Sequence, residues 1–170
     1  MAKDRVDAIL EQWRRERPEL DTSTMGVIGR INRLATLFGQ SHAEVFAAFG
    51  IDRGEFDVLA TLRRSGEPYR LSPTELFRTL MMSSGGMTSR LDRLERAGLV
   101  RRVPDPRDRR SVRVELTDHG RETIDRAVEA HVANQHQLLA ALSGADRERL
   151  AGVMRALLRS LEGGPEDEGG

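Results

Sequence analysis

Hydrophobic positions in the first half of the chain recur every three or four residues, the spacing of one face of an α-helix. In the first such segment Val6, Leu10 and Trp13 share a face, and the segment ends before Pro18. Further on, Ser72 and Pro73 supply a cap and a first-turn proline. This pattern predicts four helices, over residues 6–16, 22–49, 52–64 and 73–80.

The second half of the chain changes period. A helix opened by Ser83 and Ser84 runs to Gly98, and residues 99–103 and 111–116 then predict two short strands joined by an arginine-rich turn. Thr117 begins a long helix to about Leu142, and a last helix follows. Three helices before a hairpin predict a mainly α fold with a small β-hairpin wing, a winged helix-turn-helix with helical dimerisation arms.

We expect five segments along the chain. The last helix carries an apolar stripe with almost no chain after it to cover that stripe, so a second copy would bury it; the alternative is packing of the terminal helices within one chain. The segments are an added N-terminal helix (1–17), a dimerisation and scaffold helix (18–50), a winged helix-turn-helix DNA-binding lobe (51–116), C-terminal dimerisation helices (117–162) and a disordered acidic tail (163–170).

Composition narrows the possible chemistry of the 170-residue chain. There is no cysteine, which excludes disulfides and thiolate metal sites, and the 27 basic and 27 acidic residues cancel. The four histidines are scattered and no phosphate-binding glycine loop occurs, so we expect no enzyme activity, cofactor or metal. With no membrane-length apolar run and no signal-peptide core, we expect a cytoplasmic, nucleoid-associated protein.

Local charge differs from the balanced total. Residues 83–113 contain nine arginines and four acidic residues, and guanidinium groups suit phosphates and a narrow minor groove. A solvated charged face is the simpler alternative, but a helix followed by a hairpin favours DNA. Residues facing away from the apolar side of the helix, together with the turn, give the candidate DNA contacts Ser84, Thr88, Ser89, Arg93, Arg96, Arg107, Arg109 and Arg110, the last for minor-groove insertion.

One stretch is similar to a known family. Residues 105–120 read DPRDRRSVRVELTDHG, in which D-x-R-D-x-R is followed by L-T-x-x-G, and residues 91–102 follow the pattern LxRLExAGLVxR. Both resemble the MarR family of bacterial transcription factors. The resemblance implies a dimeric winged-helix regulator whose DNA binding responds to a small molecule.

The added N-terminal helix and the run from Trp13 to Leu34 resemble the urate-responsive branch of that family. The resemblance implies a ligand site at Trp13, Asp57, Arg90 and Arg102. Other interpretations stay open: Trp13 is also a packing anchor by pattern, Asp57 pairs with Arg53 at i, i+4 on an exposed surface, and strand alternation allows Arg102 either face.

Together these observations predict a ligand-responsive, DNA-binding repressor. We expect a homodimer on a palindromic double-stranded DNA operator, released by a small anionic planar ligand such as urate, xanthine or a related purine. A DNA-architectural protein without sequence preference or ligand is the alternative, which would lack a preference of about 10³ for one palindrome over random DNA.

Overall fold

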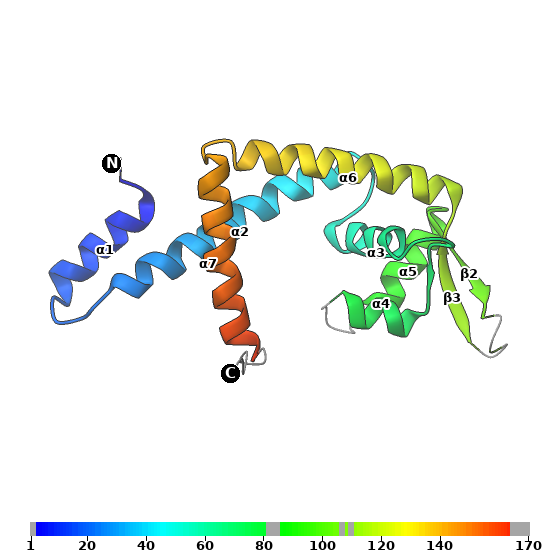
Figure 1. Ribbon diagram of the computed structural model, residues 1–170, viewed down its shortest axis with the longest axis horizontal. Coiled ribbons are helices and arrows are strands. Elements are labelled where there is room, and N and C mark those ends of the chain that lie inside the picture. Colours follow the sequence, from blue (N-terminus) through cyan, green and yellow to red (C-terminus); the bar gives the residue numbers. More distant parts are fainter. Residues whose placement is uncertain (1–2, 81–85, 106–107, 109–110, 164–170) are drawn as a thin grey trace, which may run out of the picture. The chain divides into compact units, whose positions relative to one another are not determined.

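The computed structural model describes residues 3–80, 86–105, 108 and 111–163, which form two compact units, residues 1–131 and 132–170 (Figure 1). Their elements, in chain order, are α1 (Arg5–Glu16), α2 (Ser23–Ala47), α3 (Arg53–Arg64), β1 (Arg70–Leu71), α4 (Pro73–Thr79), α5 (Met87–Arg96), β2 (Val100–Pro104), β3 (Val112–Leu116), α6 (Asp118–Leu138) and α7 (Gly144–Glu162).

The predicted fold class is confirmed, with one added strand. The sheet is antiparallel in the order β1-β3-β2, so the expected hairpin β2–β3 gains a third strand on its β3 side. Strand β1 has only Arg70 and Leu71, which is too short to give a period-2 pattern in the sequence. It pairs Arg70 with Glu115 and joins the hairpin to the helices.

The hydrophobic core lies in the first unit, between Phe46 and Ala127. On α5, Met87, Leu91 and Leu94 are buried as the helical period predicted. Val100 and Leu116 extend the core into the sheet, where they are register partners. The core therefore fixes which face of α5 turns inward and which faces solvent.

Capping residues set the starts of the two helices before α5. Asp52 and Glu55 form a capping box at α3, and Ser72 and Glu75 form another at α4, with proline in its first turn as predicted. Helix α5 begins at Met87, later than expected, and the residues before Gly86 lie outside the described ranges. Helix α6 ends at Leu138, one turn earlier than predicted.

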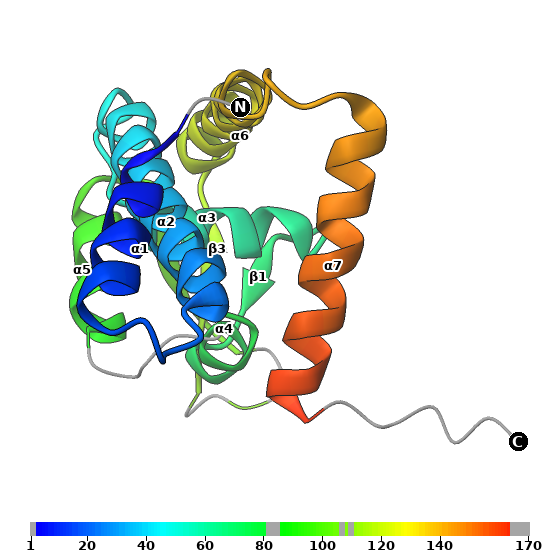
Figure 2. The same cartoon turned by 90° about the vertical axis from the view of Figure 1, so that its left-hand side faces the viewer.

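Helix α1 lies antiparallel along the first turns of α2 (Figure 2). Glycine allows the close approach, because a β-carbon at Gly26 would lie 3.1 Å from Cδ1 of Leu10. Arg30 donates to Asp7 over 2.7 Å and to Asp4 over 2.8 Å. Helix α1 is therefore held to α2 by both packing and ion pairs.

The motif L-T-x-x-G has a structural role at the start of α6. The Thr117 hydroxyl donates to the Gly98 carbonyl over 2.6 Å and accepts from the Gly120 amide over 2.9 Å. A β-carbon at Gly120 would lie 1.9 Å from the Leu99 carbonyl oxygen. The glycine is therefore required for α6 to meet the chain leaving α5.

Candidate functional site

The outer surface of α5 carries the polar side chains that the sequence predicted there. Thr88, Ser89 and Arg96 are all exposed. Arg96 donates to the Asp92 carbonyl one turn earlier over 3.2 Å. These side chains therefore lie on the face of α5 opposite its buried residues.

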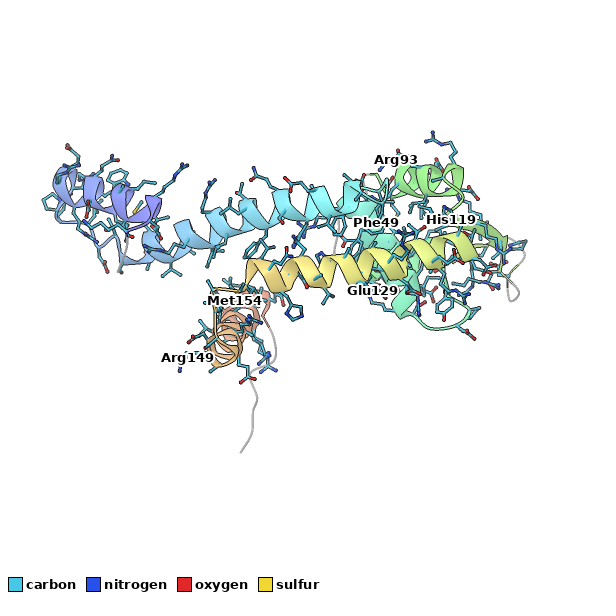
Figure 3. The ribbon with its side chains drawn as sticks, turned by 90° about the horizontal axis from the view of Figure 1, so that it is seen from above. Phe49, Arg93, His119, Glu129, Arg149 and Met154 are labelled. Carbon is cyan, nitrogen blue, oxygen red and sulfur yellow. The ribbon has the colours of Figure 1, made fainter. Side chains whose placement is uncertain are left out.

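Arg93, labelled on α5 in Figure 3, is also predicted to contact DNA, but it forms ion pairs within the protein. Its Nε donates to Glu55 over 2.7 Å and its Nη2 to Asp52 over 2.9 Å. Both carboxylates belong to the capping box of α3, and Glu55 is buried. Arg93 thus ties α5 to the start of α3.

Four of the predicted DNA contacts lie outside the described residues: Ser84, Arg107, Arg109 and Arg110. In the sequence, Ser84 precedes α5, and the three arginines lie between β2 and β3. Within the described part of that turn, Asp105 accepts from Arg113 over 2.6 Å.

Arg90 points inward from α5 toward α3. A β-carbon at Gly54 would lie only 2.4 Å from Cζ, Nε and Nη2 of Arg90, so the guanidinium rests directly on the α3 backbone. The Nε of Arg90 is buried without a hydrogen-bond partner among the described residues. The predicted inward orientation of Arg90 agrees with this geometry.

Asp57 lies one turn beyond Gly54 on α3 and is half-buried. Burial raises the pKa of the Asp57 carboxyl above its ordinary value, and the positive charges of Arg53 and Arg90 oppose that rise only in part. The interpretation of Asp57 as a fully exposed partner of Arg53 does not fit this burial. The positive charge of Arg90 on α5 is thus close enough to act on the carboxylate of Asp57 on α3.

An aromatic cluster that sequence reasoning missed lies next to Asp57. His42 and His131 meet edge to face with ring centroids 4.6 Å apart, and Phe46 stacks on Phe56 at 4.2 Å. The Nε2 of His42 is buried without a hydrogen-bond partner among the described residues. One sequence signal points to this cluster: His42 lies four residues before Phe46, on the apolar stripe of α2.

Trp13 lies at the opposite end of α2 from Asp57. Leu10 of α1 lies against Gly26 of α2, and the two helices are antiparallel, so Trp13, three residues after Leu10, lies toward the start of α2. Trp13 is 39% exposed. The 25 residues of α2 span about 37 Å, and α3 begins only after their far end. One chain therefore does not bring Trp13 to Asp57.

Arg102 lies on β2 and faces α5. Its Nη2 donates to Asp92 over 2.5 Å, its Nη1 pairs with Glu95, and its backbone amide donates to the Glu95 carboxylate over 3.0 Å. Of the four predicted ligand residues, the chain thus groups Asp57 with Arg90 and engages Arg102 elsewhere.

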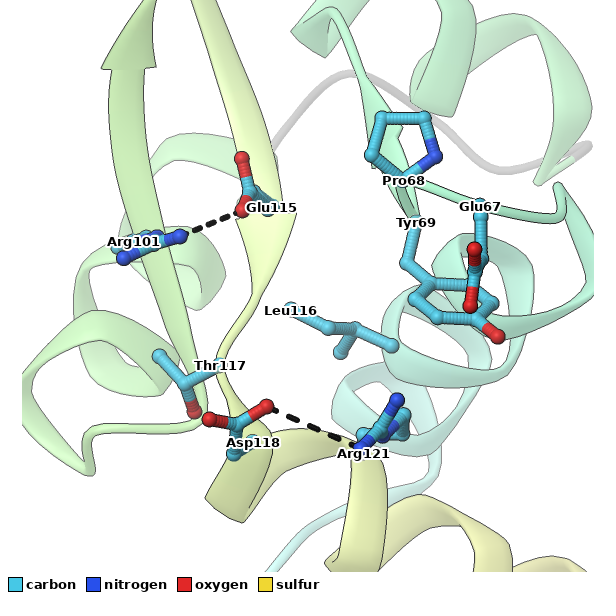
Figure 4. A pocket seen from close by; sticks show the side chains of 9 residues that line it. All are labelled: Glu67, Pro68, Tyr69, Arg101, Glu115, Leu116, Thr117, Asp118 and Arg121. Atoms are coloured by element: carbon cyan, nitrogen blue, oxygen red, sulfur yellow. Dashed lines mark hydrogen bonds and ion pairs between the residues drawn. The ribbon is translucent and has the colours of Figure 1, made fainter.

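A pocket of about 380 Å³ opens at the base of the wing (Figure 4). Tyr69 and Leu116 line its apolar side, and Arg101, Glu115 and Arg121 line its charged side. Arg101 donates to Glu115 over 2.6 Å. Because its charged groups already face one another, the pocket offers an incoming ion little unsatisfied charge.

The described residues offer neither a membrane-spanning helix nor a metal-binding cluster. No described helix is long and apolar enough to cross a membrane. No group of three or more histidine, aspartate or glutamate side chains in the described ranges is placed to hold a metal ion.

Comparisons with known proteins identify the architecture. A family model for the MarR family matches residues 49–111. The HTH-type transcriptional regulator PecS of Dickeya dadantii is 45% identical over 157 residues, which cover 92% of each chain. The transcriptional repressor MprA of Escherichia coli K12 is 31% identical, covering 72% of this chain and 69% of its own.

A solved structure adds a DNA complex to these relatives. Sco3205, a MarR family transcriptional regulator from Streptomyces coelicolor crystallised with DNA, superposes with a TM-score of 0.74 at 25% identity, covering 88% of this chain and 96% of that one. The relatives named here are transcriptional regulators and not enzymes.

Proposed function

The chain belongs to the MarR family of DNA-binding transcriptional regulators, and we propose that it is a repressor. It binds a palindromic operator as a homodimer. It releases the operator when a small anionic planar ligand, such as urate or a related purine, binds. One observation carries the ligand-responsive part of this proposal. Arg90 belongs to α5, the helix expected to read DNA, yet its guanidinium rests on α3 at Gly54. An anion bound there acts directly on the reading helix.

The charges around Arg90 suit an anionic ligand. Its buried Nε has a hydrogen to donate, and the neighbouring Arg53 adds a second positive charge. The charge of Asp57 opposes an anion. Because burial raises the pKa of the Asp57 carboxyl, proton uptake by Asp57 and anion binding favour each other. An allosteric coupling of about 1–3 kcal/mol would weaken DNA binding about 5- to 150-fold.

Trp13 enters this site only from another copy of the chain. Since one chain separates Trp13 from Asp57 by about the length of α2, a ligand that stacks on Trp13 and pairs with Arg90 needs a second protomer. Otherwise Trp13 serves as a packing anchor. Arg102 contacts the ligand only if it leaves Asp92 and Glu95.

The homodimer part of the proposal is supported by exposed apolar side chains on α2 and α7. Large hydrophobic residues on these helices remain accessible: Val27, Ile28, Leu34, Val153, Met154, Leu158 and Leu161. Burying such surface in a second copy is favourable, and a two-fold dimer places two reading helices about 34 Å apart, one turn of DNA. Sedimentation of the full chain should give twice the mass of the 19.0 kDa monomer.

The decisive experiment has two steps. Genomic DNA fragments that bind the protein are first selected, and the protein is then titrated against the selected fragments. We expect the protein to prefer the selected fragments over random DNA by a factor of about 10³ or more. Adding urate or xanthine should lower its affinity for those fragments about 5- to 150-fold. Arg90→Ala should keep fragment preference and lose the purine response. If neither purine nor other aromatic anions change affinity, the ligand part of the proposal fails while DNA recognition stands.

A further inference from the structure

Two carboxylates on α5 lie on the side of the helix that carries a predicted DNA contact. Asp92 and Glu95 follow Thr88 by four and seven residues, so all three share one row along the helix. A carboxylate in that row near the phosphate backbone repels it and lowers DNA affinity. Any α5 that enters a groove therefore needs these two charges balanced.

Arg102 supplies that balance from the wing. Its partner in the strand register is Val114, a core residue, so β2 turns Arg102 to the same side as the core and α5. There its guanidinium bridges Asp92 and Glu95, while its backbone amide holds the second oxygen of Glu95. The side chains are only partly exposed, 33% for Arg102 and 37% for Glu95.

We propose that Arg102 is a positioning residue for DNA binding, which neutralises Asp92 and Glu95 and holds them against the wing so that α5 can approach the phosphate backbone. This inference rests on the proposed function in one respect, namely that α5 is the helix that approaches DNA. It assigns Arg102 a role in the affinity of the ligand-free protein, separate from the ligand site at Asp57 and Arg90.

The inference makes the effect of Arg102 depend on the two carboxylates. Removing Arg102 alone leaves Asp92 and Glu95 facing the DNA, and we expect operator-fragment affinity at low salt to fall about 3- to 10-fold. In a background of Asp92→Asn with Glu95→Gln there is no charge left to balance. There Arg102→Ala should change affinity less than about twofold.

The experiment measures fragment binding by anisotropy for Arg102→Ala in both backgrounds, across a salt series. Arg121→Ala removes the same charge from the start of α6, where its ion-pair partner Asp118 is 3.9 Å away, and serves as the matched control. Arg102→Lys keeps the charge and should keep most of the affinity. Thermal unfolding of each variant separates loss of binding from loss of fold.

Three results would overturn the inference. An equal loss in both backgrounds, with a salt slope shallower by about one, would make Arg102 itself a phosphate contact. A loss of base preference in Asp92→Asn with Glu95→Gln would make those carboxylates base readers. A loss matched by Arg121→Ala would reduce the effect to net charge. A wild-type chain that selects no fragment would instead defeat the proposed function.

Discussion

The guanidinium of Arg90 lies so close to Gly54 that a β-carbon there would stand 2.4 Å from its Cζ. This contact joins the helix expected to read DNA to α3, beside Asp57. Since the obstructing atoms are the far end of a flexible side chain, a larger residue at position 54 would move Arg90 and leave the backbone in place.

Gly54→Ala should therefore weaken the ligand response without destabilising the protein. Alanine within a helix adds up to about 1 kcal/mol of stability relative to glycine, while the displaced guanidinium loses its place beside Asp57. The measurement is thermal unfolding together with purine titration of the DNA complex. Gly39→Ala on α2, where a β-carbon meets nothing within 4 Å, is the matched control and should leave the response intact.

Gly120→Ala should have the opposite effect on stability. Its β-carbon would lie 1.9 Å from the Leu99 carbonyl oxygen, which belongs to the backbone and cannot swing aside. We expect a loss of about 3 kcal/mol in the free energy of unfolding. Denaturant unfolding measures this loss, and Gly152→Ala on α7, with open space around it, should lose nothing.

The histidine cluster predicts a loss of stability in mild acid. Burial lowers the pKa of both His42 and His131, so the folded state favours their neutral forms. The stability that these neutral histidines contribute to the folded state is present above the unfolded pKa of about 6.5. It is lost as the pH falls through the lower pKa values of the folded state. The melting temperature should drop between pH 7.5 and 5.5.

His42→Phe should flatten that pH dependence, because the ring packing on Phe46 and His131 is kept and one titrating group is removed. His119→Gln, on the exposed surface of α6, is the control and should retain the wild-type drop. Equal drops in all three proteins would show that other groups cause the acid sensitivity.

Glu115 predicts a second, separate pH effect at the base of the wing. Burial by itself raises the pKa of Glu115, but bonds from Arg101 and Arg70 outweigh it and lower the pKa below its ordinary value. The stability that ionised Glu115 contributes to the folded state is present above the unfolded pKa of about 4.3. It is lost as the pH falls through the pKa of Glu115 in the folded state.

Glu115→Gln should cost about 1–3 kcal/mol at pH 7, because the carboxylate bonded to both neighbouring strands is replaced by a neutral amide. The difference from wild type should shrink as the pH falls through the lowered pKa of Glu115, because below it both proteins are neutral at this position. Asp118→Asn, at an exposed carboxylate of the same pocket, should show no comparable difference at pH 7 (Figure 4).

Much of the architecture could be predicted because it depends on local signals. The inward face of α5 follows from the spacing of Met87, Leu91 and Leu94, and the start of α4 from Ser72 and its proline. Strand β1 could not, because two residues carry no period and its existence depends on β3.

The site was less predictable because its contacts join distant segments. The helical period places Arg93 outward, but only the fold brings Asp52 and Glu55 to meet it. The face of Arg102 depends on the register with β3, and the distance from Trp13 to Asp57 depends on the direction of α1 along α2. None of these follows from residue spacing alone.

The core cluster runs from Phe46 to Ala127 and takes no residue from α1 or α7 among those described. Among the described residues, the core thus draws its buried side chains from the end of α2 to α6. A graft that exchanges α1 or α7 should therefore leave this core in place, and the proposed ligand residues Asp57 and Arg90 with it.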